Sequence, residues 1–300
     1  MLVPGPWTHR AVSANGIRQH VAECGDGPLV VLLHGFPEFW WSWRHQLPAL
    51  AARGYRAVAV DLRGYGDTDK PPRGYDLWTL AGDVSGLIGA LGESRAHVVG
   101  HDWGGIIAWT LAALHPRRVR SVTVVGAPHP LAVRARVLRD PRGQGRATAS
   151  HALGFQVPRV PERSLRADGG ARVERILRDW SGPRWAATED FAAAVARYRE
   201  AIRVPGAAHS AMEYHRWAFR SQFRADGRRF AAAVARPPAV PVLAVHGAHD
   251  PWLLPATARA SARWAGEAHR LEVLDDGVGH FPHQERPDVV NALLRGFLGP

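Results

Sequence analysis

Residues 96–105 read Ala-His-Val-Val-Gly-His-Asp-Trp-Gly-Gly, a short apolar run followed by an aspartate among small residues. Its first residues are mostly apolar, which is typical of a buried strand. A tight turn follows, in which small residues flank Asp102 in the pattern Gly-x-Asp-x-Gly. Helical spacing then runs to His115, and Pro116 ends it. The stretch therefore predicts a strand, a sharp turn that lifts the Asp102 side chain out of a sheet, and a helix.

Strand-like and helix-like segments alternate on both sides of this turn, after a hairpin predicted over residues 8–24 with its turn at Asn15-Gly16. The predicted strands are Leu29–Leu33, Arg56–Asp61, Ala96–His101, Val119–Val125, Pro241–His246 and Arg270–Leu274. The predicted helices are Ser42–Ala52, Leu80–Leu91, Trp103–His115, Thr257–Trp264 and one from Asp288. Such alternation predicts an α/β fold, with a mostly parallel sheet covered by helices on both faces.

The alternation stops between residues 130 and 236. This stretch contains helical segments such as Phe191–Ile202 and Ser210–Phe219, but it has no strand pattern. We therefore expect residues 130–236 to form a helical cap inserted into an α/β core made of residues 1–129 and 237–300. A chain of 300 residues is long enough for such a core with an insert.

The net charge of +11 lies in the same stretch, because residues 130–236 hold 21 Arg and 10 acidic residues. The rest of the chain holds 17 basic and 17 acidic residues. Lys70 is the only lysine, so a bias in composition is one explanation for the arginines. Attraction of anionic substrates, of an acidic partner or of a membrane surface is the other. Nucleic acid is not expected, because no recognition motif accompanies the charge.

Several features of the sequence limit the possible functions. Cys24 is the only cysteine, which excludes a disulfide within the chain. The first residues lack a signal-peptide pattern, and no apolar run is long enough to span a membrane. We therefore expect a cytoplasmic protein without a membrane span. No Cys/His grouping has zinc-ligand spacing, so no metal site is predicted. The oligomeric state is left open.

Asp102 has two interpretations. It can simply cap the following helix, or it can act as a nucleophile that displaces a leaving group from carbon and forms an ester. An ester would need an activated water for its release, and histidine is the usual base. His280 follows the last predicted strand and is preferred over His283, which lies further into the loop. Asp250, just after the preceding strand, would orient it. The order Asp102, Asp250, His280 is the order of nucleophile, acid and histidine in α/β-hydrolases.

Two backbone N–H groups complete this hypothesis. The turn His34-Gly35-Phe36-Pro37 follows a buried strand, so the N–H groups of Phe36 and Trp103 can together form an oxyanion hole. An ordinary Gly-Pro turn is the alternative. A carboxylate nucleophile suits epoxides and alkyl halides, whose electrophilic carbon is tetrahedral, better than peptides or simple esters.

At this point the chain resembles the epoxide hydrolases of the α/β-hydrolase fold. The similar segments are His34-Gly35-Phe36-Pro37-Glu38-Phe39-Trp40-Trp41-Ser42-Trp43-Arg44-His45-Gln46, Asp61-Leu62-Arg63-Gly64-Tyr65-Gly66-Asp67-Thr68-Asp69-Lys70-Pro71, the turn at Asp102, and Gly279-His280-Phe281-Pro282-His283-Gln284-Glu285-Arg286-Pro287. The resemblance implies that Asp102 attacks a ring carbon, His280 activates water and Asp250 orients His280. It also implies a cis bond between Phe36 and Pro37, and a small-molecule epoxide substrate with no cofactor.

The chain departs from this family in the cap. Family members usually place two tyrosines over the nucleophile, where they hydrogen-bond the epoxide oxygen. The corresponding positions hold His151, four residues before Phe155-Gln156-Val157-Pro158, and His215, directly before Arg216. Tyr214 lies one place earlier. Adjacent helical positions point about 100° apart, so we expect only one of Tyr214 and His215 to face the pocket.

Three further rings, Trp40, Trp41 and Phe281, are predicted to line the substrate pocket, although packing in the core is an equal alternative. Two other functions stay open. A haloalkane dehalogenase would use the same Asp-His-Asp machinery, but many dehalogenases carry Asn where this chain has Phe36. A non-catalytic binding protein of the same fold would keep the pocket and use the basic cap for a partner.

Overall fold

The computed structural model describes residues 1–299, except for the side chains of residues 150–152. Its eight-stranded sheet has the order β1-β2-β4-β3-β5-β6-β7-β8. The strands are β1 (Thr8–Ala14), β2 (Ile17–Cys24), β3 (Leu29–Leu33), β4 (Arg56–Val60), β5 (Ala96–His101), β6 (Val119–Val125), β7 (Val242–Gly247) and β8 (His269–Leu274). Only the β1–β2 and β2–β4 pairs are antiparallel. The predicted, mostly parallel α/β sheet is confirmed.

The hairpin also forms where the sequence predicted it. Asn15 and Gly16 join β1 to β2 with φ angles of 49° and 76°. Positive φ at both central residues matches the twist of the two flanking strands, and Asn-Gly adopts it readily.

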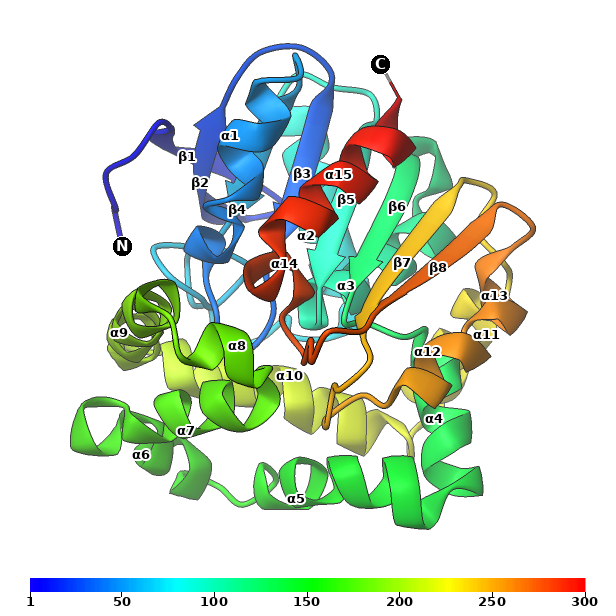
Figure 1. Ribbon diagram of the computed structural model, residues 1–300. Coiled ribbons are helices and arrows are strands. Elements are labelled where there is room, and N and C mark those ends of the chain that lie inside the picture. Colours follow the sequence, from blue (N-terminus) through cyan, green and yellow to red (C-terminus); the bar gives the residue numbers. More distant parts are fainter. Residues whose placement is uncertain (300) are drawn as a thin grey trace.

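Seven helices accompany the sheet within the described core. They are α1 (Gln46–Ala51), α2 (Leu77–Ala90), α3 (Trp103–Leu114), α12 (Pro255–Ala260), α13 (Ala262–Ala265), α14 (Pro282–Glu285) and α15 (Pro287–Leu298). Figure 1 shows α1 and α15 on one face of the sheet, with α2 and α3 on the other. The sheet is therefore covered on both faces, as expected.

Eight helices lie between β6 and β7, and we call them the cap helices. They are α4 (Pro130–Arg139), α5 (Arg146–Gly154), α6 (Val160–Arg166), α7 (Ala171–Trp180), α8 (Pro183–Ala186), α9 (Glu189–Arg203), α10 (Ala207–Ser221) and α11 (Ala225–Val234). Figure 1 shows most of them below the sheet, on the side where the parallel strands end. They fall within residues 130–236, and the exact bounds of a cap domain stay a prediction.

Two predicted helices are interrupted. The stretch 42–52 forms a 3₁₀ turn over Trp40–Trp43 followed by α1, and the stretch 257–264 is divided into α12 and α13. At the second break, the Ser261 N–H donates to the carbonyl of Ala258 rather than to that of Thr257. This tighter bond ends α12 with a 3₁₀ turn.

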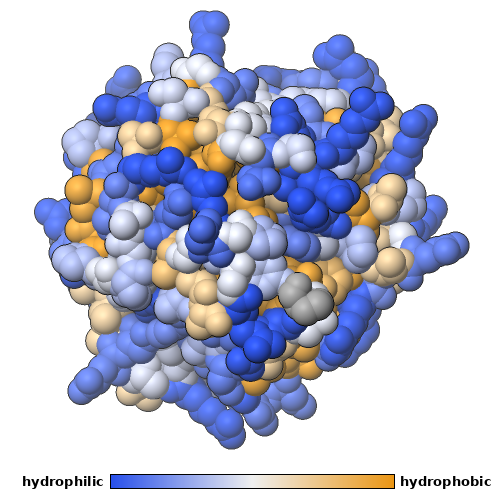
Figure 2. Space-filling view, turned by 90° about the horizontal axis from the view of Figure 1, so that it is seen from above, coloured by the Kyte–Doolittle hydropathy of each residue, from blue (hydrophilic) through white to orange (hydrophobic). Residues whose placement is uncertain are grey.

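The surface away from the cap helices is mostly hydrophilic. Figure 2 views this end of the molecule, where apolar residues form small, interrupted patches between hydrophilic ones. Among the described residues, no helix has both the length and the apolar character needed to cross a bilayer.

Candidate active site

Asp102 sits in a strained turn between β5 and α3. Its φ and ψ angles are 46° and −114°, which a residue with a side chain rarely adopts. The neighbouring glycines make the turn possible. A Cβ on Gly104 would lie 2.1 Å from the Leu33 carbonyl oxygen, and one on Gly100 would lie 2.2 Å from the Gly104 carbonyl oxygen. Small residues therefore let the turn press against β3, and backbone strain of this kind clusters at functional sites.

Asp102 is buried, with 4% of the residue exposed, and its carboxylate faces the loop after β3. Its Oδ2 atom accepts a hydrogen bond from the Phe36 N–H at 3.0 Å. The Phe36–Pro37 bond is cis, as the resemblance implied. A Cβ on Gly35 would lie 2.6 Å from the Asp102 Cβ, so this approach also requires glycine. The described hydrogen bonds contain no corresponding contact from the Trp103 N–H.

His280 lies between two carboxylates. Its Nδ1 atom is 2.7 Å from Asp250 Oδ2, and its Nε2 atom is 3.9 Å from Asp102 Oδ1. Burial disfavours the charged imidazole, but Asp250, with a smaller effect from Asp102, outweighs it and raises the pKa of His280 to about 9. Burial alone would raise the pKa of Asp250, but His280 outweighs this effect and keeps the pKa of that carboxyl below its usual value.

Asp250 is itself fixed by the backbone. Its Oδ1 atom accepts the N–H groups of Trp252 and Leu253, each at 2.9 Å. Its Oδ2 atom is thereby left for His280, and the ring of His280 is held with Nε2 toward Asp102.

The loop that carries His280 is held by Glu285. The Glu285 carboxylate accepts the backbone N–H groups of Gly279 and Phe281 in this loop and of Gly182 between α7 and α8. The backbone N–H of His280 donates to the backbone carbonyl of Trp180 at 2.8 Å. The loop that carries His280 therefore makes direct hydrogen bonds to the cap helices.

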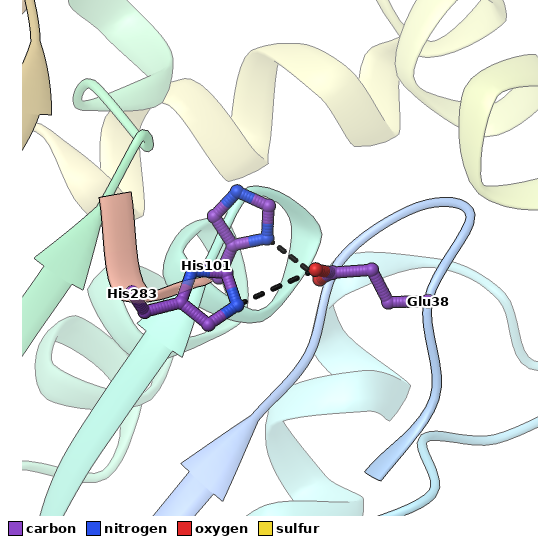
Figure 3. Close-up of side chains that lie close together, drawn as sticks. All are labelled: Glu38, His101 and His283. Atoms are coloured by element: carbon purple, nitrogen blue, oxygen red, sulfur yellow. Dashed lines mark hydrogen bonds and ion pairs between the residues drawn. The ribbon is translucent and has the colours of Figure 1, made fainter. Parts of the chain in front are cut away.

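A second, fully buried cluster contains Glu38, His283 and His101, which directly precedes Asp102 in the chain (Figure 3). The Glu38 carboxylate is 2.7 Å from His101 Nδ1 and 3.3 Å from His283 Nε2. Burial raises the pKa of Glu38, but the two histidines outweigh it and hold that pKa well below its usual value. His101 Nε2 is 2.9 Å from the carbonyl oxygen of His280. Both nitrogens of the His101 ring therefore face oxygen atoms, one on the Glu38 side chain and one on the His280 backbone.

Within the described residues, this is the one cluster with a composition suited to a metal, since its ligand atoms lie within 4.8 Å of one another. Both carboxylate oxygens of Glu38 already accept hydrogen bonds, however. Its Oε2 atom accepts from the Gly35 N–H at 3.0 Å as well as from His101, and its Oε1 atom accepts from the Gln284 side chain at 2.7 Å. We therefore interpret the cluster as a hydrogen-bond network that supports the carbonyl of His280. His283, the alternative base, lies in this network.

Asp102 opens into a cavity of about 500 Å³. Apolar side chains of α4, α10 and α11 form much of its wall, and His215 and Trp103 line it together with Asp102. Leu138 and Phe223 also line it and are 73% and 75% exposed, so the cavity reaches the surface. Its size is typical of a site for a small organic molecule.

The two neighbours on α10 point in different directions. His215 lines the cavity, and its Nε2 atom accepts the indole N–H of Trp103 at 3.3 Å. Tyr214 is fully buried and donates its hydroxyl to the Arg63 carbonyl at 2.7 Å. Tyr214 therefore does not belong to the cavity wall. The side chain of His151 lies outside the described residues.

The three rings predicted for the substrate pocket are not among the residues that line this cavity. Trp40 is fully buried, packs on Trp7 and donates to the Met1 carbonyl. Trp41 stacks under the Arg44 guanidinium. Phe281 is fully buried beside the ring of His280. Their contacts agree with the alternative of packing in the core and at its junction with the cap helices, and a role in the substrate pocket stays a prediction.

Sequence reasoning gave no role to Glu38 or His101, although both lie in the segments that carried the resemblance. Glu285 was missed in the same way. Two signals were available in the sequence. One is Gly-His-Asp at residues 100–102, which follows a buried apolar run, and the other is the glutamate four residues after His34. The pairing itself joins segments 63 residues apart, so spacing along the chain could not reveal it.

Comparison with known proteins agrees with this geometry. Residues 28–287 match the family model described as alpha/beta hydrolase fold. The chain is 35% identical to an AB hydrolase superfamily protein of Bacillus subtilis, with 96% of both sequences covered. It is 32% identical to Epoxide hydrolase A of Mycobacterium tuberculosis, with 98% of both covered. The crystal structure of Epoxide Hydrolase A from Mycobacterium thermoresistibile superposes with a TM-score of 0.82 at 30% identity, covering 97% of this chain and 98% of that one.

The chain therefore belongs to the α/β-hydrolase-fold family. Within that family it is an epoxide-hydrolase-like enzyme, and the resemblance inferred from its motifs is confirmed.

Proposed function

We propose that this enzyme converts epoxides to vicinal diols through a covalent ester on Asp102. In the first half-reaction, Asp102 Oδ1 attacks a ring carbon and the carbon–oxygen bond of the ring breaks. Oδ2 is engaged by the Phe36 N–H at 3.0 Å, which leaves Oδ1 as the attacking atom. The ring oxygen leaves as an alkoxide and takes a proton from a donor on the cap.

In the second half-reaction, His280 removes a proton from a water molecule, and the resulting hydroxide attacks the carboxyl carbon of the ester. The negative charge of the tetrahedral intermediate forms on the oxygen beside the Phe36 N–H. Collapse of the intermediate releases the diol and restores the Asp102 carboxylate. The proton on His280 returns to solvent, and the cap donor regains from solvent the proton that it gave to the alkoxide.

The observation that carries this proposal is the placement of His280. Asp250 holds its Nδ1 atom at 2.7 Å, and its Nε2 atom faces Asp102 at 3.9 Å. This separation is too long for a direct hydrogen bond and leaves His280 directed at the reacting carboxyl group. A helix-capping role for Asp102 has less support, because its side chain accepts no hydrogen bond from the first turn of α3.

The same geometry couples the two half-reactions. Asp102 is one of the charges that raise the pKa of His280. Formation of the ester removes that charge, so the pKa of His280 falls when the ester needs a base. A histidine that is protonated in the resting enzyme can then release that proton to solvent and act as the base for water.

We propose that His215 supplies one of the cap protons. Its Nε2 atom accepts the Trp103 indole N–H, so a neutral His215 carries its own proton on Nδ1. His151 is proposed as the second donor on the basis of the sequence alone. Residues 130–236 would then act as the cap that places both histidines over Asp102.

The test is to trap the ester. His280→Gln should alkylate at close to the normal rate but hydrolyse slowly, so that intact-protein mass spectrometry after mixing with styrene oxide shows one added substrate mass on an Asp102 peptide. Asp102→Asn, of similar shape but a poor nucleophile, is the matched control and should stay unmodified. Unlabelled His280→Gln protein that still forms diol would contradict the mechanism. Release of bromide from a bromoalkane without turnover of any epoxide would favour the dehalogenase alternative.

A further inference from the structure

Helix α4 presents a regular stripe to the cavity that contains Asp102. The stripe consists of Pro130, Val133, Arg134, Val137 and Leu138, which occupy the positions i, i+3, i+4, i+7 and i+8 that form one face of a helix. Four of its five side chains are apolar. The exception is Arg134, which is the only Arg or Lys among the described residues that line the cavity.

Arg134 has no competing acidic partner in the part of the chain that the structure describes. Among the described residues, no carboxylate lies within ion-pair distance of its guanidinium, whereas Arg136 on the same helix pairs with Asp140 at 2.9 Å. Arg134 is exposed, so its charged end stays hydrated while its side chain borders the cavity. Leu138 lies one helical turn further along the same stripe, where the cavity reaches the surface.

The cavity wall thus carries both signs of charge. Asp102 is the acidic side chain of the described wall, and it would repel an anionic group placed beside it. Arg134 offers the opposite charge, and an arginine binds a carboxylate with two parallel N–H donors. Apolar side chains fill most of the remaining wall.

We propose that Arg134 is a specificity-determining residue that anchors the terminal carboxylate of an amphiphilic epoxide. The preferred substrate has an epoxide near Asp102, an apolar body along the α4 stripe and an anionic end at Arg134. The inference rests on the proposed epoxide hydrolysis for the reaction, but the anion anchor is a property of the cavity and can be tested by binding alone.

Arg139 supplies the matched control. It is exposed on the same helix but does not line the cavity, so Arg139→Gln removes the same charge without removing the proposed contact. In wild-type enzyme, kcat/KM for an epoxide that bears a terminal carboxylate should exceed that for its methyl ester. Arg134→Gln should reduce this ratio roughly three- to tenfold, as expected for a partly exposed ion pair beside an apolar wall, and Arg139→Gln should leave it nearly unchanged.

Binding of decanoate and of 1-decanol, measured by calorimetry, makes the anchor testable without turnover. Wild-type protein should bind decanoate more tightly than 1-decanol, and only Arg134→Gln should remove the difference. Arg134→Lys should restore part of it, because a lysine keeps the charge but not the paired donors. An enzyme that hydrolyses no epoxide but shows this pattern would contradict the proposed function and support the anchor. Equal losses in Arg134→Gln and Arg139→Gln, or no preference for decanoate in the wild type, would overturn the anchor.

Discussion

At the scale of single residues, the charge state of His280 depends on two carboxylates. Asp250 and Asp102 together overcome the effect of burial and raise the pKa of His280 to about 9. Replacing Asp102 with Asn removes one of these charges, so we predict a lower pKa of His280 in Asp102→Asn. The pKa can be followed by NMR on labelled histidine. A matched control is Asp179→Asn, on the cap helix α7, which should leave the titration of His280 unchanged.

The raised pKa of His280 also makes the free energy of unfolding depend on pH. The folded-state pKa of His280 lies above its usual value, so its ion pairs contribute stability below about pH 6.5. This contribution is lost as the pH rises through about 9. An Asp102→Asn protein should therefore lose less stability than the wild type between these pH values. An unchanged pKa of His280 in Asp102→Asn would contradict the proposed coupling of the two half-reactions.

The two neighbours on α10 give a second prediction at this scale. His215 lines the cavity, whereas the Tyr214 hydroxyl is committed to the Arg63 carbonyl. His215→Phe should slow alkylation of Asp102 about 10²-fold, the lower end of the loss for one donor to a developing oxyanion. Rapid-quench measurement of ester formation checks this, and ester hydrolysis should be much less affected. Tyr214→Phe is the control, and a similar slowing of alkylation in it would show that the effect comes from packing.

At the scale of elements, the turn between β5 and α3 depends on the absence of side chains. A Cβ at Gly104 would lie 2.1 Å from the Leu33 carbonyl oxygen, which belongs to β3 and cannot move aside easily. Gly104→Ala should therefore cost about 3 kcal/mol or more in the free energy of unfolding and displace Asp102. Urea denaturation measures the first effect and the rate of ester formation the second.

Gly296 offers the opposite case. A Cβ there meets nothing within 4 Å, and the residue lies inside α15. Gly296→Ala should stabilise the protein by about 0.5–1 kcal/mol, because alanine loses less backbone entropy in a helix. A Gly104→Ala protein as stable as Gly296→Ala would show that β3 and the turn can separate without cost.

The elements were predictable from sequence where the information is local. The strand, turn and helix around Asp102 follow from apolar runs and small residues within one stretch. The side chain that α10 turns toward the cavity does not, because Tyr214 and His215 differ only by the rotation of a helix whose packing is set elsewhere. Trp40 shows the same limit, since its ring packs on Trp7 near the N-terminus. The pairing of Glu38 with His101 joins separate segments, which only the fold brings together.

At the scale of the whole molecule, the excess charge and the site lie on the same part of the chain. All of the +11 balance falls in residues 130–236, and the cap helices within that range line much of the cavity. The proposed anchor makes use of one of these 21 arginines. The general field of the others would act on the approach of an anionic substrate and weaken with salt, whereas a contact at Arg134 would persist more strongly.

The cap helices are also joined to the rest of the chain by an ion-pair network around Asp190 at the start of α9. Its carboxylate accepts from the Arg44 guanidinium at 2.5 and 3.1 Å and from the Trp185 indole at 2.8 Å, and it lies 3.2 Å from His45 Nε2. Arg44 in turn donates to Gln284 at 2.7 Å, next to the loop that carries His280. The Arg44 side chain is only 6% exposed, so it depends on Asp190 to balance its charge.

Asp190→Asn should therefore destabilise the protein at pH 7 by about 1–2 kcal/mol, a value reduced for the partial exposure of Asp190. Burial raises the pKa of Asp190, but His45 and Arg44 outweigh it and lower that pKa far below its usual value. A lowered pKa contributes stability above the unfolded value of about 3.9, and this is lost as the pH falls further. The difference between wild type and Asp190→Asn should thus shrink below pH 4, which urea denaturation at pH 7, 5 and 3 can follow. Glu200→Gln, which removes an exposed acid of the same helix, should cost almost nothing. A loss as large in Glu200→Gln as in Asp190→Asn would mean that the charge of α9, rather than the contact with Arg44, holds the cap on the core.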